Sequence, residues 1–384
     1  MPTTKALRPP RAILICVAAS SLLPGWACAK RVPVAVAPVY FPAAPELPRI
    51  QFLTSFAGLR DVQQQSSFAR LVAGENPDIK VNKPYGVDVS GGRVYVCDTN
   101  STVAVFDFEK KTFAPMKGAV GPGQLRQPTN ISIAPDGTRY VSDPVRGQVL
   151  AFDKKDEFLR AYGDPNSWHP VDAVWFAGRL YVVDTTHAVV KVLDAASGEE
   201  VGTIGDKGDP ADRLARPTNI AVDTEGRIYV TDFGRFQVLR FDREGVFQLA
   251  YGKLGDNRGH FARPKGIAVD RAGRLYVVDA AFNNVQIFDP AGRLLMFFGE
   301  NSLGPGGLQL PAKVTIDYDN LKHFRQFLQP GFQAEYLVFV TGQVGERRVN
   351  VFAFGKAQGR RYPEDDELKR LIEERRKREL ERPH

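Results

Sequence analysis

The chain has 384 residues, of which 43% are hydrophobic and 25% charged, and its formal net charge is +7 at pH 7. This balance is typical of a globular protein and excludes both a disordered polymer and a multispan membrane protein. With 35 glycines and 27 prolines against 3 methionines, the composition favours many short strands joined by turns over a helix bundle. The charge excess is mild, and scattered basic residues of this kind indicate solubility more than a nucleic-acid partner.

Residues 1–29 are predicted to be a secretory signal, because basic residues up to Arg11 precede a short apolar run that ends in small residues. The run is shorter than the ~20 apolar residues that a membrane-spanning helix needs. Two cleavage sites compete. Ala27-Cys28-Ala29 fits cleavage before Lys30, whereas Ala27-Cys28 also resembles the end of a bacterial lipobox, in which Cys28 would carry a lipid. We therefore expect an extracytoplasmic protein that is periplasmic, anchored to an outer membrane through Cys28, or secreted.

Residues 30–48 are rich in Pro, Val and Ala and show no period, so they are predicted to form an extended tether. Once the signal is removed and Cys28 is lipidated or lost, Cys97 is the remaining cysteine, which excludes a disulfide framework. Cys97 falls within an apolar run, and we expect it to be a small buried side chain rather than a nucleophile.

The next part of the chain contains a motif of about 45 residues that recurs six times. Each copy opens with a proline followed by a β-rich run, and the spacings are 44, 42, 47, 47 and 47 residues: Pro84, Pro128, Pro170, Pro217, Pro264 and Pro311. In the first five copies a second run ends in an aspartate: Asp98, Asp143, Asp184, Asp232 and Asp279. A third run ends at a further aspartate: Asp107, Asp153, Asp194, Asp242 and Asp289. The period indicates one structural unit per copy.

The fifth copy shows most clearly what each unit is. Its runs of four or five apolar residues are separated by Asp270-Arg-Ala-Gly273 and Asp289-Pro-Ala-Gly292, which suit type I turns. Each unit is therefore predicted to be a four-stranded antiparallel meander. One such sheet cannot bury both faces alone, whereas six packed radially can, so we expect an all-β, six-bladed β-propeller over residues 84–355.

The sixth unit lacks a fourth strand after Phe354. Residues 49–58 contain Ile50–Phe56, which resembles the fourth strands of other units, so this N-terminal strand is predicted to complete the last blade. Residues 59–83 would connect it to the first unit. Two additions are expected outside the meanders: a helical insertion at 317–335, with a short amphipathic helix at 319–328, and a charged tail helix at 356–384.

The units resemble NHL repeats, a six-bladed propeller family whose units run Pro-x-Gly-Ile-Ala-Val, Tyr-Val-x-Asp, Val-x-x-Phe-Asp and Phe-x-x-x-Phe-Gly. The resemblance covers residues 50–58 and 84–354. Trp-Asp propellers are disfavoured because the chain has no Trp-Asp pair, and the repeated Gly-Gly pairs of kelch units occur here at two places alone. Unit six departs from the pattern, with Thr341 and Ala353 at the positions expected for aspartate.

In an up-and-down blade, the start of the first strand and the loop between strands two and three lie at the same end. Residues at these positions vary while the framework repeats, which is typical of a binding face on a rigid scaffold. The alternative is a solvated rim of turn residues. The predicted binding-face residues are Tyr85, Asn100, Arg146, His187, Arg235, Lys265, Phe282, Asn283, Lys313 and Arg347.

The resemblance also implies an enzymatic alternative, because some propeller lyases and hydrolases hold a metal at the channel mouth. Asn130, Asp172 and Asn219 come from consecutive units and could offer oxygen ligands to calcium. No nucleophile elbow, phosphate loop, haem-attachment motif or zinc pattern occurs, and no catalytic residue is predicted. The leading prediction is a monomeric, non-enzymatic scaffold without a cofactor that binds an envelope or extracellular protein or a glycan, with no nucleic-acid partner. The alternative is a calcium-dependent hydrolase or lyase.

Overall fold

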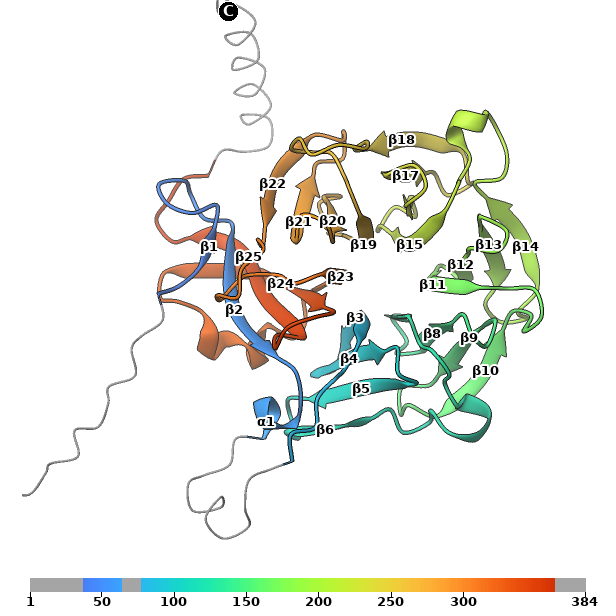
Figure 1. Cartoon of the computed structure of the whole chain (residues 1–384), viewed down its shortest axis with the longest axis horizontal. Helices are drawn as coiled ribbons and strands as arrows, with labels where there is room; N and C mark the ends of the chain where they lie inside the picture. The colour runs from blue at the N-terminus through green and yellow to red at the C-terminus, as the bar shows by residue number, and fades with distance from the viewer. Residues whose placement is uncertain (1–36, 64–76, 363–384) are drawn as a thin grey trace, which may run out of the picture. The chain divides into compact units, whose positions relative to one another are not determined.

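The computed structural model describes residues 37–63 and 77–362, and these residues form six antiparallel sheets arranged around a common axis (Figure 1). Five sheets have four strands and one has five. The prediction of a six-bladed propeller is therefore confirmed. We number the blades in chain order, so that blade 1 begins at Pro84 and blade 6 at Pro311.

In blades 1 to 5 the strands run outward from the axis in chain order, whereas in blade 6 the fourth strand comes from the N-terminal part of the chain. The first strands are β3 (Pro84–Ser90), β7 (Asn130–Ile133), β11 (Pro170–Phe176), β15 (Pro217–Val222), β19 (Pro264–Val269) and β23 (Pro311–Asp317). The second strands are β4 (Arg93–Asp98), β8 (Arg139–Asp143), β12 (Arg179–Asp184), β16 (Ile228–Asp232), β20 (Leu275–Asp279) and β24 (Phe332–Gly342). The third strands are β5 (Thr102–Asp107), β9 (Gln148–Phe152), β13 (Val189–Asp194), β17 (Gln237–Phe241), β21 (Asn284–Phe288) and β25 (Val349–Ala357). The fourth strands are β6 (Thr112–Pro115), β10 (Phe158–Tyr162), β14 (Glu200–Ile204), β18 (Phe247–Tyr251), β22 (Leu294–Phe298) and β2 (Ile50–Phe56).

The second strands form the centre of each blade. Every residue of β8, β16 and β20 is buried, because a neighbouring blade covers each face of the sheet. This explains why β16 and β20 begin with continuous apolar runs, Ile228–Val230 and Leu275–Val278, rather than with an alternation of apolar and polar residues. The buried Cys97 belongs to such a strand, β4, and its thiol is free, as the sequence predicted. Burial raises the pKa of this thiol well above its ordinary value.

The turns follow the predicted chemistry. In blade 5, Asp270 accepts hydrogen bonds through Oδ1 from the backbone N–H groups of Ala272 and Arg274. Gly273 closes the turn with φ at 75°, a conformation that side chains other than glycine adopt only with strain. Asp289 binds the N–H groups of Ala291 and Arg293 in the same way in the next turn.

The aspartate that ends the second strand has a structural role. The Asp232 carboxylate accepts hydrogen bonds from the backbone N–H groups of Ala215 at 2.6 Å and Arg216 at 2.9 Å, and thereby fixes the connection from the preceding blade. Corresponding bonds are made by Asp98, Asp143, Asp184 and Asp279. In blade 6, Pro311 pairs with Gly342, as Pro217 pairs with Asp232. Gly342 therefore takes the aspartate position there, one residue later than the sequence comparison placed it at Thr341.

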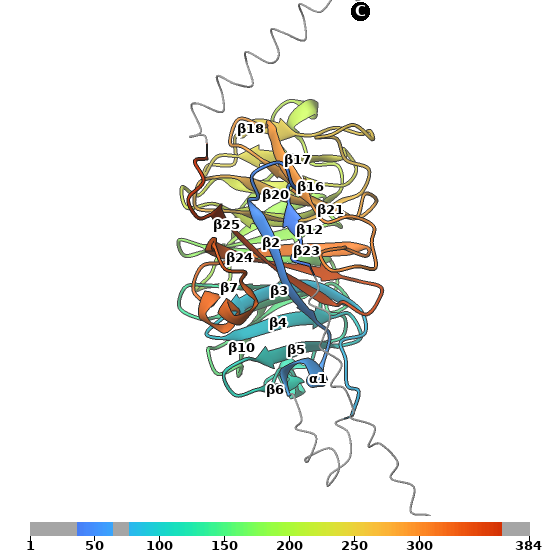
Figure 2. The ribbon, with the colours of Figure 1, turned by 90° about the vertical axis from the view of Figure 1, so that its left-hand side faces the viewer.

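The N-terminal strand closes the ring as predicted. β2 pairs antiparallel with β25, with Phe52 opposite Phe352 and Phe56 opposite Val349. Figure 2 shows β2 and β25 side by side on the outside of the ring. A short strand that was not predicted, β1 (Tyr40–Phe41), pairs with β2 and gives blade 6 its fifth strand.

The predicted tether at 30–48 is therefore wrong for the part that the structure describes. The ring of Phe41 lies 6.2 Å from that of Phe298 and 6.3 Å from that of Phe352, so the chain folds onto blade 6 instead of extending away from it. Two aromatic side chains within a proline-rich segment supply the apolar area that favours this packing.

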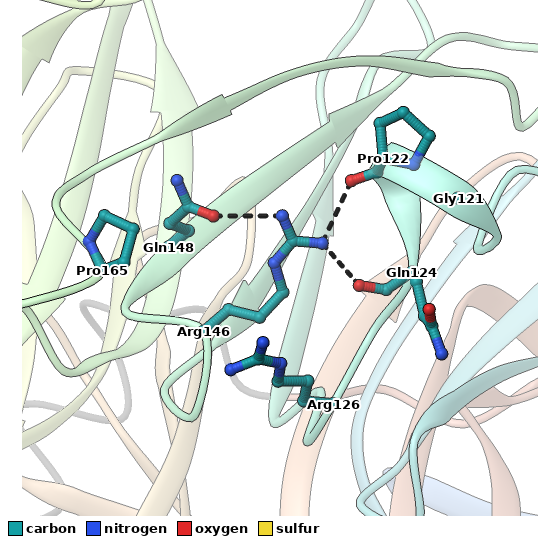
Figure 3. Close-up of a pocket in the computed structure, with 7 residues that line it drawn as sticks. All are labelled: Gly121, Pro122, Gln124, Arg126, Arg146, Gln148 and Pro165. Carbon is teal, nitrogen blue, oxygen red and sulfur yellow. Dashed lines mark hydrogen bonds between the residues drawn. The ribbon is translucent and has the colours of Figure 1, made fainter.

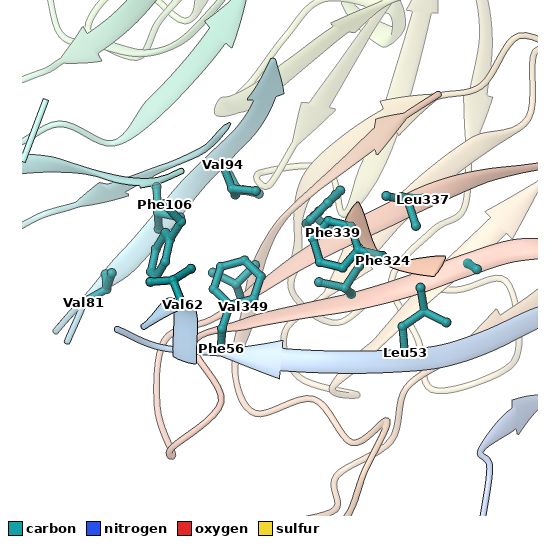
Figure 4. Packing of buried hydrophobic residues seen from close by; sticks show 14 of the residues in the cluster. Leu53, Phe56, Val62, Val81, Val94, Phe106, Phe324, Leu337, Phe339 and Val349 are labelled. Carbon is teal, nitrogen blue, oxygen red and sulfur yellow. The ribbon is translucent and has the colours of Figure 1, made fainter. Parts of the chain in front are cut away.

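The contact between the first and last blades is a large apolar cluster (Figure 4). At its centre, the ring of Phe56 lies 4.7 Å from that of Phe106 and 5.3 Å from that of Phe108. Phe324 completes the cluster, 5.0 Å from Phe108 and 5.5 Å from Phe339. Residues from both ends of the propeller sequence thus bury one another, and this packing holds the ring closed.

The helical insertion differs from the prediction. β23 continues to Asp317 and β24 begins at Phe332, so the insertion is shorter than 317–335, and it forms two 3₁₀ turns, η3 (Leu321–His323) and η4 (Arg325–Phe327), instead of an α-helix. The Asp317 carboxylate accepts hydrogen bonds from the backbone N–H and the side-chain Nδ2 of Asn320, the residue that precedes η3. The predicted apolar face does exist, because Phe324 is buried in the cluster and Leu328 packs against it. Tertiary packing over a span this short outweighs the preference for a regular α-helix.

Smaller elements lie in the connections. The predicted connecting segment 59–83 begins with α1 (Leu59–Val62), and the connections after blades 1 and 3 contain η1 (Gly121–Gly123) and η2 (Pro210–Asp212). None of the helices within the described ranges has the length and apolar composition needed to cross a bilayer. The tail helix predicted at 356–384 is wrong for residues 356–362, because β25 continues to Ala357 and the following described residues are not helical. The rest of that tail and the predicted signal at 1–29, with the lipidation site Cys28, lie outside the described residues.

Candidate functional site

One face of the ring gathers most of the predicted site residues. We call it the mouth face: it contains the starts of the first strands, the loops between second and third strands, and the connections between blades. At equivalent positions, the third residue from each opening proline is Gly86, Asn130, Asp172, Asn219, Gly266 or Lys313. Glycine is required at 266, because an added Cβ would lie 2.5 Å from the Cα of Lys313 in the next blade. Tyr85 and Lys265, which were also predicted, lie one residue earlier.

An ion pair crosses the channel. Lys313 belongs to β23 of blade 6 and Asp172 to β11 of blade 3, and these strands face each other across the ring (Figure 1). The Lys313 Nζ lies 2.6 Å from the Asp172 Oδ2, and the two residues are only 6% and 1% exposed. The same carboxylate oxygen also accepts hydrogen bonds from Asn219 Nδ2 at 3.1 Å and the backbone N–H of Ile220 at 3.2 Å. The ammonium group thus neutralises the one acid of this level of the channel.

The two asparagines beside Asp172 each have an unused oxygen. Asn130 donates through Nδ2 to the Val171 carbonyl at 2.9 Å, and Asn219 donates through Nδ2 to Asp172. These bonds fix the orientation of both carboxamides, and both Oδ1 atoms are buried without a hydrogen-bond partner within the described residues. Buried acceptors of this kind attract a donor or a cation. The structure therefore brings the three predicted calcium ligands together, with Lys313 already bound to the carboxylate.

Lys265 and Tyr85 form a second contact at the mouth. The Lys265 Nζ donates to Gln343 Oε1 at 2.7 Å and lies 5.2 Å from the centre of the Tyr85 ring. Burial, with a smaller effect of Arg263, lowers the pKa of Lys265 to about 8. Burial also raises the pKa of Tyr85 to about 12, and the Asp172 charge adds to this shift. Both side chains therefore belong to the wall of the mouth.

Asp88 is an acidic residue of β3 that sequence reasoning missed. Its carboxylate accepts hydrogen bonds from Thr315 Oγ1 at 3.0 Å and the backbone N–H of Ile133 at 2.8 Å, so it links blades 6, 1 and 2 near the axis. Burial raises its pKa to about 6, although the hydrogen bonds and the Lys313 charge oppose the shift. The repeat alignment could not single it out, because aspartates occur throughout the units.

The predicted rim arginines bind the protein's own loops. Arg146 donates to the carbonyls of Pro122 and Gln124 and to Gln148 Oε1, as Figure 3 shows. In blade 4, Arg235 repeats this arrangement by donating to the carbonyls of Pro210 and Arg213 and to Gln237 Oε1. Arg347 donates to the Gly304 carbonyl. These contacts give the three arginines a role within the fold, while their role in binding a partner stays a prediction.

The other predicted rim residues lie in the loops after the second strands. His187 Nδ1 lies 2.6 Å from Asp184 Oδ2, and Asn283 accepts a hydrogen bond from the backbone N–H of Leu310 through Oδ1. The backbone N–H groups of Asn100 and Phe282 bind the aspartate that precedes each loop. The Asn100 side chain is exposed. These residues surround the mouth without converging on one point.

Exposed apolar side chains gather on the mouth face. Among the described residues, ten large apolar side chains are exposed, and six of them lie in mouth-face connections or loops: Ile79, Val120, Val145, Leu254, Leu303 and Val344. Sequence reasoning missed them, because single apolar residues in glycine- and proline-rich connections follow no period. Charge is also unequal. The described connections of this face carry 15 Lys and Arg against 9 Asp and Glu, whereas the turns joining first to second and third to fourth strands carry 11 against 13.

No group of three or more His, Cys, Asp or Glu side chains in the described ranges is arranged to hold a metal. The predicted calcium ligands include two asparagines and so form a different kind of set. The charged and amide side chains at the mouth can therefore form hydrogen bonds to a polar group of a ligand, neutralise its charge and fix its orientation. The wide rim around it offers apolar and basic side chains to a larger partner.

Comparison with known proteins agrees with this architecture. Residues 214–241 match the NHL repeat, and no curated protein matches the chain in sequence. A solved protein of unknown function from Bacteroides thetaiotaomicron shares 13% identity over 79% of this chain and 75% of its own, with a TM-score of 0.55. A gluconolactonase from Xanthomonas campestris shares 14% identity over 83% of this chain and 98% of its own, with a TM-score of 0.51. Virginiamycin B lyase from Staphylococcus aureus shares 12% identity over 73% and 98%, with a TM-score of 0.49.

Identities this low reflect a shared fold alone. The matched segment spans the first, second and third strands of blade 4, where the repeat pattern of the sequence is regular. The chain is therefore a six-bladed β-propeller in which residues 214–241 match the NHL repeat.

Proposed function

We propose that this chain is a non-enzymatic binding scaffold that works outside the cytoplasm and holds a protein partner on its mouth face. The observation that carries the proposal is the concentration of exposed apolar side chains on that face, in loops that a rigid ring positions. These side chains come from loops of different blades, so a partner that spans the ring would cover several of them at once. The predicted signal at 1–29 supports the extracytoplasmic location.

The Lys313–Asp172 pair supports a scaffold over an enzyme. A hydrolase with a metal at the channel mouth needs a carboxylate that is free to bind the metal, and here the ammonium of Lys313 lies at 2.6 Å from that carboxylate. Displacing the ammonium would leave a buried positive charge without its partner, which is costly. Binding through the loops requires no such rearrangement.

The experiment is capture of the partner from an envelope extract of cells that naturally express the protein. The test variant replaces Val120, Leu254 and Leu303 together with aspartate. The matched control replaces Leu159, Val201 and Val246, which are also more than half exposed (54%, 51% and 61%) but lie outside the mouth face. We expect the test variant to lose the captured protein and the control to retain it. Equal capture by both variants would refute the proposal.

A second candidate, a calcium-dependent hydrolase or lyase, is favoured by the unpaired Oδ1 atoms of Asn130 and Asn219 beside Asp172. If calcium binds there, it competes with the Lys313 ammonium, so Lys313→Met strengthens calcium binding and Asp172→Ala abolishes it. Isothermal titration calorimetry of the two variants and the natural protein measures both effects. Absence of calcium binding in Lys313→Met would exclude this candidate.

A further inference from the structure

A pocket of about 600 Å³ opens on the mouth face between the connections on either side of blade 2 (Figure 3). Its lining residues are Gly121, Pro122, Gln124, Arg126, Arg146, Gln148 and Pro165. Two guanidinium groups and two carboxamides line it, and no carboxylate does. A concave surface of this composition favours an anionic group.

Arg146 is held rigidly at the pocket wall. Its Nη1 donates to the Pro122 carbonyl at 3.0 Å and to the Gln124 carbonyl at 2.5 Å, and its Nη2 donates to Gln148 Oε1 at 3.1 Å. These bonds fix the guanidinium plane before any ligand arrives, which reduces the entropy lost on binding. They also orient Gln148, because its oxygen accepts from Arg146 and its amide N–H groups are left for another acceptor.

Arg126 supplies the available charge. Its backbone N–H donates to Asp143 Oδ2 at 2.6 Å, so its main chain is fixed by the aspartate that ends the second strand of blade 2. Its side chain is exposed, and within the described residues its guanidinium makes no hydrogen bond or ion pair. Guanidinium groups bind carboxylates through two parallel hydrogen bonds, which gives both strength and direction.

Blade 4 provides an internal comparison. Arg235 and Gln237 repeat the arrangement of Arg146 and Gln148, with Arg235 bound to two loop carbonyls. The residue two positions before the opening proline is Ala215 there, whereas it is Arg126 in blade 2. The connection before blade 4 also carries three aspartates: Asp206, Asp209 and Asp212. The same connection carries Lys207, Arg213 and Arg216, so its charges balance, whereas the connection before blade 2 carries Lys117 and Arg126 and no acid. The anionic preference of the blade 2 pocket therefore depends on Arg126.

The pocket is flanked by apolar side chains. Val120 is 67% exposed and directly precedes Gly121, and Val145 is 50% exposed and directly precedes Arg146. A free inorganic anion gains nothing from these valines. A peptide that carries an acidic side chain beside an apolar one can contact the arginines and the valines at the same time.

We propose that the blade 2 pocket binds the carboxylate side chain of an acidic peptide segment in which the neighbouring residues are apolar. This inference rests on the proposed function, because it names the chemistry of the protein partner that the mouth face engages. Arg126 forms the bidentate pair with the carboxylate, Gln148 donates to it, and Val120 and Val145 contact the neighbouring side chains.

The test uses fluorescence anisotropy with a labelled peptide of alternating valine and glutamate, and the same peptide with glutamine in place of glutamate. The protein is compared with Arg126→Gln and with Arg258→Gln, a mouth-face arginine that lies outside the pocket. Arg146 is left unchanged because it holds the loop. We expect saturable binding of the glutamate peptide, with a Kd tighter than about 1 mM. The affinity should fall about fivefold or more in Arg126→Gln or with the glutamine peptide, and stay unchanged in Arg258→Gln.

Three outcomes would overturn the proposal: no saturable binding of the glutamate peptide, equal binding by the natural protein and Arg126→Gln, or equal binding of the two peptides. Inorganic phosphate is added as a competitor in a further arm. If phosphate binds as tightly as the peptide, the pocket accepts free anions and the assignment to a peptide is wrong. Failure of the proposed function can be distinguished from failure of this inference. In that case the variant with aspartate at Val120, Leu254 and Leu303 would still capture the partner, independently of the result of the peptide titration.

Discussion

The ion pair between Asp172 and Lys313 can be tested by a double-mutant cycle. The two charges lie 2.6 Å apart in a buried site, where their attraction amounts to about 6 kcal/mol at an effective dielectric constant of ~20. Burying the two ions costs several kcal/mol each, so the pair as a whole contributes little to the free energy of unfolding. Removing one member alone leaves the other charge buried without its partner. Asp172→Asn and Lys313→Met should therefore each destabilise the protein by about 3–5 kcal/mol.

Changing both residues together removes both charges. The double variant should unfold within about 2 kcal/mol of the natural protein, which corresponds to a coupling free energy of about 3 kcal/mol or more. Lys322 and Glu109 provide the control cycle. Their charges are 3.3 Å apart, but both side chains are exposed, so their coupling should not exceed about 1 kcal/mol.

The assay is urea unfolding at pH 7, followed by tryptophan fluorescence and by circular dichroism. The two signals must give the same transition for the free energies to be comparable. Additive effects of Asp172→Asn and Lys313→Met, or a coupling no larger than that of the Lys322–Glu109 pair, would refute the cross-channel contact.

Three further predictions concern closure, connections and pH. Phe56→Ala should lower the free energy of unfolding in urea by about 3–5 kcal/mol, because the ring is buried at the closure of the propeller. The control Phe297→Ala, at a side chain that is 41% exposed, should lower it by less than about 1 kcal/mol. Similar losses of stability in the two variants would contradict closure of the ring by Phe56. Asp232→Asn should increase hydrogen exchange at residues 213–216, since one of the two oxygens that accept from the backbone N–H groups of Ala215 and Arg216 becomes an NH2 donor. Asp256→Asn at an exposed site should not, and unchanged exchange in Asp232→Asn would refute the role of the aspartate. Lys265→Met should be more stable than the natural protein at pH 7 by up to about 3 kcal/mol, because the pKa of Lys265 is lowered to about 8 and burial therefore disfavours its charged form. The natural protein should recover this difference as pH rises from 8 to 10.5, and a pH-independent difference would contradict the shift.

The repeat period was sufficient to predict the blades. Six prolines and five aspartates in register can recur only if each unit has the same backbone, and the structure explains why the aspartates are needed, since each binds the connection that precedes it. Strand closure by Ile50–Phe56 was also predictable. The sixth unit lacks a fourth strand of its own, and the strand Ile50–Phe56 belongs to no other unit. Pairing this strand with the sixth unit buries both.

The contacts at the candidate site could not be predicted in the same way. A variable position in a repeat can contact a ligand, a loop or another blade, and the sequence does not separate these cases. The position that Arg146 and Arg235 occupy differs in residue type among the units, as expected for a binding face. Each arginine nevertheless donates hydrogen bonds to carbonyls of the connection beside its own blade. Lys313 and Asp172 lie 141 residues apart, and only the geometry of a closed ring brings them together.

The insertion and the tether show a different limit. Apolar spacing correctly predicted an apolar face in the insertion, where Phe324 is buried, but it did not distinguish an α-helix from two 3₁₀ turns, because the strands on either side determine the span. The segment containing Phe41 looked extended because of its prolines. Its aromatic side chains nevertheless pack onto blade 6, and this packing could be foreseen only once the position of β2 was known.

Site-specific photo-crosslinking tests the central claim, binding of a protein partner through the mouth face, most directly. A photoreactive phenylalanine analogue is placed singly at Val120, Leu254 and Leu303, and, for comparison, at Leu159 and Val201 on the outer strands. We expect the three mouth-face positions to form adducts with one and the same protein in cells, and the outer positions to form none with it. Adducts at the outer positions, without adducts at the mouth face, would contradict the account.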